Sequence, residues 1–312
     1  MTQLKLTFNN PFEAEGTWLK GVLHVHTTES DGELTPEQVV HVYYKRGYQF
    51  VAITDHWKLV NPSDFSITDD FLVIPGEEIT AGKGLVGTPY HIVALNIKEE
   101  LERGMFLKES PEDARAAIKT ILNLGGLAVI AHPSWSDLCF ADLLCLEGYL
   151  GIEVFNMTCH VTVDKGWSWS QWIGLLSSGK QVFGLAVDDA HWHTSTYNRL
   201  DAFGGWVLVK AKSLRVEDVL ESIKKGLFYS STGPLIHNVE VSNNTIHVKT
   251  SPVISISFLA YESRGRRYEA THSKYLTEVS YTIKGNEKFI VIKCEDGKGG
   301  VAWTNPIIVK DS

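Results

Sequence analysis

The chain has 312 residues, 44% of them hydrophobic and 21% charged, a composition typical of a soluble globular protein. This length can bury a large core, and one barrel-sized domain could use most of it. The formal net charge of −8 disfavours broad binding to a nucleic-acid backbone, which needs a positive surface. It does not exclude a small anionic substrate, because bound metal ions reverse the local field.

The four cysteines form no Cys-x-x-Cys pair, and their spacing indicates no disulfide framework. Reduced thiols in a cytosol are the simplest interpretation. The first ten residues lack an apolar core of signal-peptide length, and no segment has the length of a membrane span. We therefore expect a cytoplasmic protein without a membrane partner.

Short apolar runs alternate with helical patterns from about residue 18 to residue 230. Helices are predicted to begin after Thr35 and Ser110, where an N-cap residue precedes a proline, and a third covers Val216–Lys225. The apolar runs show little alternation, as in strands covered on both faces. These runs are Gly21–His26, Phe50–Thr54, Phe71–Ile79, His91–Ile97, Leu127–Ala131, Ile152–Asn156, Val182–Val187 and Gly205–Lys210. The succession of strands and helices along the chain predicts a mainly parallel α/β sheet or barrel.

The pattern changes after Gly233-Pro234, where short strands separated by polar or glycine-containing turns replace the helical period. Asn243-Asn244 and Lys284-Gly285-Asn286 are hairpin signals. We predict a first domain over residues 1–234, with its core at about 18–232. A small β-sandwich-like domain is predicted over residues 235–312.

Two histidines, His24 and His26, follow an apolar strand and precede an acidic loop that contains Gly32. Side chains two residues apart on a strand point to the same face, so these imidazoles could bind one divalent metal ion. Taken alone, the pair could equally be two ordinary polar residues.

Further histidines and carboxylates follow later apolar runs, at the strand ends where α/β barrels place catalytic groups. Any one of them is most simply a satisfied structural residue or a solvated acid. Their recurrence at successive strand ends favours a multinuclear metal site. The candidates are Asp55, His56, Glu78, His132, Asp189, His191 and His193, with Asp188 predicted to orient ligand imidazoles.

His91 lies at the beginning of a strand rather than at its end. The connection from Ala81 to Thr88 carries no helix, so strands 71–79 and 91–97 are predicted to form a hairpin that places His91 beside Glu78. His132 is followed by Pro133, which predicts an extended backbone at His132.

The chain resembles the PHP family, the polymerase and histidinol phosphatase metal-dependent phosphoesterases, over residues 20 to 193. The resemblance rests on the elements His24-Val25-His26, Ser30-Asp31-Gly32, Thr54-Asp55-His56, Pro75-Gly76-Glu77-Glu78, His91, His132-Pro133 and Asp189-Ala190-His191. It implies a distorted (β/α)7 TIM-like barrel with two or three divalent ions, Mn, Fe or Zn, at its rim. The implied ligands are His24, His26, Asp31, His56, Glu78, His91, His132, Asp189 and His191. Asp31 stands where some relatives use histidine.

On this hypothesis, Asp55, His191 or His193 relays a proton to the leaving group. Phosphate recognition usually needs a cation; Arg199 is the first candidate and Lys58 a weaker one. Trp135 and the tryptophans of residues 166–172 could stack on a base or sugar, or could pack helices onto the barrel.

The leading functional hypothesis is hydrolysis of a phosphate mono- or diester of a small molecule, a nucleotide or sugar phosphate, by a metal-activated hydroxide. One alternative is a 3′–5′ exonuclease that acts on short oligonucleotides. Another is a non-catalytic binding protein that contains metal. The chain has no polymerase region, and its sequence predicts no oligomeric state.

Overall fold

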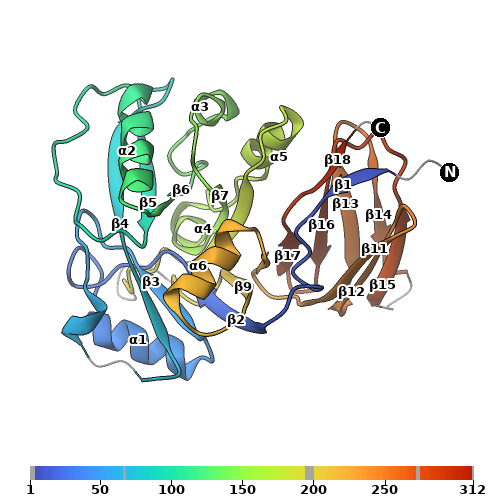
Figure 1. The fold of residues 1–312 in the computed structure, drawn as a ribbon, viewed down its shortest axis with the longest axis horizontal. Coiled ribbons are helices and arrows are strands. Elements are labelled where there is room, and N and C mark those ends of the chain that lie inside the picture. Colours follow the sequence, from blue (N-terminus) through green and yellow to red (C-terminus); the bar gives the residue numbers. More distant parts are fainter. Residues whose placement is uncertain (1–3, 66–67, 194–199, 272–274, 311–312) are drawn as a thin grey trace.

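A computed structural model describes residues 4–65, 68–193, 200–271 and 275–310. An α/β region occupies one side of the molecule, and a region built of strands occupies the other (Figure 1). The predicted boundary at residues 234 and 235 falls between strands β10 (Phe228–Ser231) and β11 (Ile236–Ser242). Among the described residues, no helix is long and apolar enough to cross a membrane.

The α/β region contains a strand at each of the eight predicted positions, with shifted bounds. The strands are β2 (Thr17–Val22), β3 (Phe50–Ile53), β4 (Leu72–Lys83), β5 (Pro89–Leu95), β6 (Leu127–Ile130), β7 (Gly151–Asn156), β8 (Phe183–Val187) and β9 (Trp206–Ala211). Strands β2 to β4 and β6 to β8 pair in parallel. Strand β5 pairs antiparallel with both β4 and β6, and β9 pairs antiparallel with β2. The sheet is therefore mixed, because β4 and β5 form the predicted hairpin.

The three predicted helices are present as α1 (Pro36–Lys45), α2 (Pro111–Asn123) and α6 (Val216–Lys224). Thr35 and Gln38 form the expected capping box at the start of α1. Ser110 precedes α2 but makes no side-chain capping bond. The sequence interpretation missed the short helices α3 (Phe140–Leu144), α4 (Met157–Val163), α5 (Trp169–Ser177) and the 3₁₀ turn η1 (Pro62–Asp64).

A closed TIM-like barrel is not shown. The hydrogen-bonded order runs β9-β2-β3-β4-β5-β6-β7-β8, with no ladder between β8 and either β2 or β9 among the described residues. Strand β9 occupies the free edge of β2 from Thr17 to Gly21. Beyond that edge, Val25 forms a single parallel bridge with Ala190, which follows β8. The ends of β2 and β8 therefore meet at one rim.

Two antiparallel sheets form the C-terminal region. One contains β11, β12 (Thr245–Val253) and β15 (Leu276–Thr282). The other contains β13 (Ser255–Ala260), β14 (Gly265–Glu269), β16 (Phe289–Glu295), β17 (Val301–Thr304), β18 (Ile307–Lys310) and the N-terminal β1 (Lys5–Thr7). Strand β17 pairs with β10, so this second sheet is continuous with the sheet of the α/β region.

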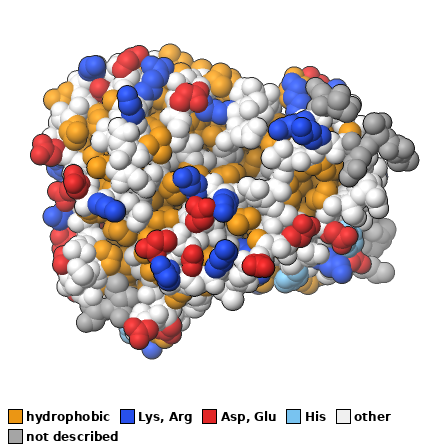
Figure 2. Space-filling view, in the orientation of Figure 1, with side chains coloured by type: hydrophobic (Ala, Val, Ile, Leu, Met, Phe, Trp, Pro, Cys, Tyr) orange, Lys and Arg blue, Asp and Glu red, His pale blue; other side chains and the backbone are white. Residues whose placement is uncertain are grey.

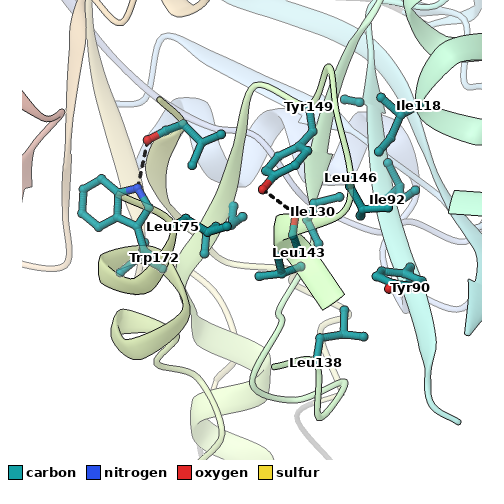
Figure 3. Close-up of a cluster of buried hydrophobic side chains, with 14 of the residues drawn as sticks. Tyr90, Ile92, Ile118, Ile130, Leu138, Leu143, Leu146, Tyr149, Trp172 and Leu175 are labelled. Carbon is teal, nitrogen blue, oxygen red and sulfur yellow. Dashed lines mark hydrogen bonds between the residues drawn. The ribbon is translucent and has the colours of Figure 1, made fainter. Parts of the chain in front are cut away.

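The tryptophans of residues 166–172 pack against other parts of the chain; Trp167 and Trp169 are partly buried. Trp172 is fully buried, and its indole N–H donates to the Val182 carbonyl (Figure 3). Trp169 contacts Trp303 of β17, with ring centroids 5.1 Å apart, and Trp167 contacts the same ring at 6.0 Å. These contacts support packing between the α/β region and the C-terminal sheets over stacking on a ligand. On the face shown in Figure 2, acidic and basic side chains are interspersed.

Candidate metal centre

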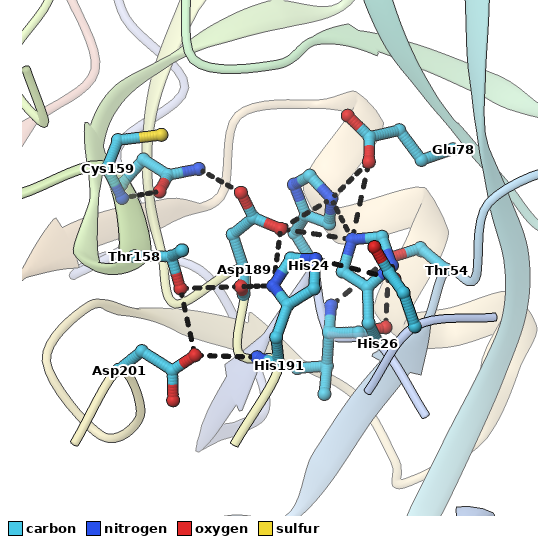
Figure 4. A network of polar contacts seen from close by, with 12 residues as sticks. His24, His26, Thr54, Glu78, Thr158, Cys159, Asp189, His191 and Asp201 are labelled. Carbon is cyan, nitrogen blue, oxygen red and sulfur yellow. Dashed lines mark hydrogen bonds and ion pairs between the residues drawn. The ribbon is translucent and has the colours of Figure 1, made fainter. Parts of the chain in front are cut away.

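His24 and His26 lie just beyond the end of β2, on an extended segment between β3 and the chain that follows β8. The His26 backbone N–H donates to Ala190 O (3.0 Å), and the Asp189 N–H donates to His24 O (2.9 Å). On the other side, the Thr54 N–H donates to Val25 O (2.9 Å). Both imidazoles point to the same side, with their Nε2 atoms 3.1 Å apart (Figure 4). The predicted common face is confirmed.

The first group of candidate ligands is fully enclosed and consists of His24, His26, Glu78 and Asp189. Glu78 Oε2 lies 3.3 Å from Nε2 of each imidazole. Asp189 Oδ1 lies 3.2 Å from His24 Nε2 and 3.0 Å from His26 Nε2. All four side chains point to one centre, although they come from three separate segments of the chain.

The second group consists of Glu78, His91 and His132. Here Glu78 uses its other oxygen, Oε1, which lies 2.9 Å from His91 Nδ1 and 3.1 Å from His132 Nε2. The β4–β5 register, in which Thr80 pairs with His91, brings His91 beside Glu78. The predicted hairpin and its consequence are confirmed, and one carboxylate joins two groups of imidazoles.

The third group, Asp31, His56 and His191 together with His26, is the most open. Asp31 Oδ1 lies 3.5 Å from His191 Nε2, and Asp31 Oδ2 lies 3.7 Å from His56 Nε2. The Asp31 side chain is 51% exposed, whereas the first group is buried. All nine predicted ligands thus fall into three adjoining groups.

Glu153 and Asn156 of β7 support three of these ligands from behind. Glu153 Oε1 lies 2.6 Å from His24 Nδ1, and its Oε2 accepts the backbone N–H of His132 at 2.7 Å. Asn156 Nδ2 donates to Glu153 Oε2 at 2.9 Å and to Asp189 Oδ2 at 3.0 Å. Sequence reasoning assigned neither residue. The available signal was a glutamate within the apolar run Ile152–Phe155.

Asp55 and Asp188, by contrast, hold backbone loops. Asp55 accepts hydrogen bonds from the backbone N–H and the hydroxyl of Thr27, both at 2.7 Å, and from Ser30 Oγ at 2.5 Å. It therefore fixes the loop that joins His26 to Asp31. Asp188 accepts from Tyr43 OH and from backbone N–H groups of residues 203–205. Glu153, and not Asp188, contacts the His24 imidazole.

The residues predicted to contact substrate or to relay a proton have different surroundings. His193 Nε2 lies 2.9 Å from the Asp31 backbone oxygen. Lys58 forms an ion pair with Glu100, with Nζ and Oε2 3.4 Å apart. Trp135 lies against His91 and His132. Arg199 lies outside the described residues.

Two candidate ligands have strained backbones. The φ angles of His132 (28°) and Asp189 (58°) lie in the left-handed region, which costs free energy for any residue with a Cβ atom. The prediction of an extended His132 is therefore wrong. Its N–H is held by Glu153, and its carbonyl accepts the Ser136 N–H at 3.1 Å, so these bonds override the preference that Pro133 imposes.

Burial and charge act against each other in the first group. Burial lowers the pKa of His26, but the adjoining carboxylates of Asp189 and Glu78 outweigh it and raise that pKa to about 9. Burial would raise the pKa of Glu78, but His24 and His91 hold it well below its ordinary value. The Asp189 pKa is also lowered against the cost of burial, with His24 the largest favourable cause. The carboxylates thus remain ionised in the interior.

These residues fit a cluster of divalent metal ions. Asp189 Oδ1 is buried and has no hydrogen-bond partner, although a buried carboxylate oxygen is costly to leave unpaired. Imidazole nitrogens with carboxylate oxygens are a donor set suited to Zn, Fe and Mn. The neighbouring imidazoles pair with Asp189 Oδ1 by charge but give it no hydrogen bond, and a metal ion would supply the missing partner.

No protein-family model matches the chain. Among solved structures, the chain is similar to a two-domain protein from Bacteroides vulgatus that contains a predicted PHP-like metal-dependent phosphoesterase. The TM-score is 0.50 at 14% identity, and the match covers 98% of both chains. The fold is thus that of a two-domain PHP-like protein, and the resemblance noted in the sequence is confirmed at the level of the fold.

Two curated proteins are similar in sequence. An uncharacterized protein of Methanocaldococcus jannaschii is 30% identical over 152 residues, which cover 44% of this chain and 82% of that protein. The chain belongs to the same family as this archaeal protein. The DNA polymerase/3′-5′ exonuclease PolX of Bacillus subtilis is 36% identical over 63 residues, which cover 20% of this chain and 11% of PolX.

Proposed function

We propose that the protein is a metal-dependent phosphoesterase that hydrolyses a phosphate mono- or diester of a small molecule. The observation that carries this proposal is the placement of Glu78, whose two carboxylate oxygens each serve a different group of imidazoles. A carboxylate shared in this way suits two adjacent divalent ions. Two-metal sites support displacement at phosphorus in phosphatases and nucleases, and they also occur in aminopeptidases.

The three groups would hold two or three ions, of Mn, Fe or Zn. When bound, such ions stabilise negative charge on phosphoryl oxygens and lower the pKa of water. The first group is buried, so its residues would hold an ion away from solvent. Asp31, His56 and His91 are partly exposed, so we place the substrate phosphate on their side of the site.

The chain itself would supply a proton to the leaving group. Asp55 is a weaker candidate than the histidines, since Thr27 and Ser30 already donate to its carboxylate. His191 belongs to the third group, where its nitrogen would serve as a ligand. His193 lies outside the three groups but beside Asp31, so we assign this role to His193.

The same rim supports a proposal on architecture. We infer that β2 to β8 form a strongly distorted barrel of the PHP type, which is closed, within the described part of the chain, where Val25 meets Ala190. This closure brings His24, His26 and Asp189 together, and it therefore couples the fold directly to the site.

The test combines metal analysis with hydrolysis. Purified protein should contain two or three metal ions per chain and should hydrolyse p-nitrophenyl phosphate or its bis ester with added Mn²⁺. Replacement of both His24 and His26 by alanine should remove metal and turnover together. Unchanged turnover in the folded double variant would contradict the proposal.

A second candidate is a 3′–5′ exonuclease that acts on short oligonucleotides, which the local similarity to PolX favours. The net charge of −8 argues against long polynucleotides as substrates. A labelled oligonucleotide would be degraded to a ladder by an exonuclease and left intact by an enzyme restricted to small molecules.

A further inference from the structure

Trp135 is exposed at the edge of the candidate metal centre. Its side chain is 41% exposed, and it is the one tryptophan among the exposed large hydrophobic residues that the structure describes. Its ring centroid lies 5.0 Å from that of His132 and 5.8 Å from that of His91. The ring planes are steeply inclined, at 75° and 64°. The indole thus stands beside the second group of ligands without stacking on either imidazole.

The turn that carries Trp135 is braced on both sides. The Ser134 N–H donates to Ser168 Oγ at 3.1 Å, and the Ser134 hydroxyl donates to Trp167 O at 2.7 Å. On the other side, the Ser136 N–H donates to His132 O, and Ser136 Oγ lies 3.2 Å from His132 Nδ1. These bonds hold the turn against the segment of residues 166–172 on one side and against His132 on the other. The backbone thus presents the indole in a fixed place.

His91, one of the partly exposed candidate ligands, adjoins this indole. His24 and His26 are fully buried, whereas the His91 side chain is 14% exposed and that of His56 is 27% exposed. A phosphate bound on the partly exposed side of the centre, beside His91, would have this indole as a neighbour of its ester group. Exposure of a large aromatic ring to water is unfavourable, and a braced aromatic ring beside a polar site is well suited to stack on a ligand.

We propose that Trp135 forms a subsite for a planar aromatic leaving group, so the substrate class is phosphate esters that carry an aromatic or heteroaromatic ring. This inference rests on the proposed phosphoesterase function and refines it. Trp135 would act as a specificity-determining residue by stacking on that ring. It would leave the binding of the phosphoryl group to the metal centre.

The experiment measures the binding of stable phosphonates to the Mn²⁺-loaded protein by calorimetry. Phenylphosphonate and cyclohexylphosphonate have similar size and charge, but only the first is aromatic; methylphosphonate reports the phosphoryl site alone. Wild-type protein should bind phenylphosphonate about threefold to tenfold more tightly than cyclohexylphosphonate. Trp135→Leu should reduce this preference to less than twofold, and Trp135→Phe should keep part of it. Methylphosphonate should bind all three proteins equally.

Equal binding of the two ring compounds by wild-type protein would overturn the inference, as would an unchanged preference in Trp135→Leu. Metal content and thermal unfolding of each variant identify any loss of the centre, and Trp135→Phe provides the comparison with an aromatic ring retained. If methylphosphonate and inorganic phosphate both fail to bind the metal-loaded wild type, the proposed function itself fails. If methylphosphonate and inorganic phosphate bind but phenylphosphonate is not preferred over cyclohexylphosphonate, only the proposed aromatic subsite is contradicted.

Discussion

Glu78 Oε1 lies 2.9 Å from His91 Nδ1, across the hairpin that β4 and β5 form. With a βαβ connection, β5 would run parallel to β4, and His91 at its start would lie at the opposite edge of the sheet, away from the other candidate ligands. The antiparallel pair instead returns the chain at once, so the first residues of β5 lie beside the last part of β4. The departure from a parallel sheet thus completes the second group of ligands.

Removal of the shared charge should therefore affect two groups together. Glu78→Gln keeps the shape of the side chain but removes the carboxylate that faces five imidazoles, those of His24, His26, His56, His91 and His132. We expect the loss of at least two bound ions and of hydrolysis, measured by elemental analysis and by p-nitrophenyl phosphate turnover. Glu77→Gln is the matched control, because Glu77 is equally buried but accepts the Leu101 N–H away from the centre. Equal metal loss in both variants would indicate general disruption.

Glu153 should act through the ligands that it holds. Glu153→Gln weakens the support of the His24 imidazole and of the His132 backbone, both of which Glu153 contacts directly. Loss of such supporting partners typically lowers metal affinity by about 10- to 100-fold. Competition with a calibrated chelator measures this change. Glu147→Gln, at an exposed side chain paired with Lys180, should retain wild-type affinity; a similar affinity in Glu153→Gln would contradict the role given to Glu153.

The stability of the metal-free protein should depend on pH in a defined direction. The pKa of His26 is raised from 6.5 to about 9, so its contribution is complete below pH 6.5 and is lost as pH rises through 9. The pKa of Glu78 is lowered, so its contribution is present above its ordinary value of 4.5 and is lost as pH falls below it. The free energy of unfolding should therefore be highest between about pH 5 and 6.5.

Urea unfolding with a chelator, at pH 6, 7.5 and 9, measures this decline. Metal binding requires neutral imidazoles, so protein saturated with Zn²⁺ should lose less stability across the same range. His26→Gln should flatten the decline of the metal-free protein. A metal-free protein that becomes more stable between pH 7 and 9 would show that the buried carboxylates do not hold these protons.

Trp172 should contribute to stability and not to metal binding. Its buried indole packs beneath β8 and donates to Val182, so Trp172→Ala leaves a cavity and an unpaired carbonyl. Substitutions of this kind cost about 3–5 kcal/mol of unfolding free energy. Chemical unfolding measures the cost, and metal content per folded chain should stay unchanged. A lower metal content with little loss of stability would contradict the packing role.

Much of the candidate site could be predicted because most of its residues lie at strand ends, where a short apolar run followed by histidine or a carboxylate is a local signal. The hairpin that places His91 was legible from a connection without a helix. These features depend on neighbouring residues only.

The remainder depends on contacts between distant segments. The role of Glu153 requires His24, which lies 129 residues away. The left-handed backbone of His132 arises from hydrogen bonds that outweigh the effect of Pro133. The bridge from Val25 to Ala190 likewise has no local signal. Pairings of this kind are fixed by tertiary packing, so a periodic pattern along the chain does not encode them.

The central claim is that Glu78 joins two metal ions. Anomalous diffraction from a crystal of the Zn²⁺-loaded protein tests it directly. We predict two peaks on opposite sides of the Glu78 carboxylate, each about 2.0–2.2 Å from one oxygen, with His24, His26 and Asp189 around one and His91 and His132 around the other. A loaded crystal with no peak beside Glu78, or with a single ion bound by both of its oxygens, would contradict the account.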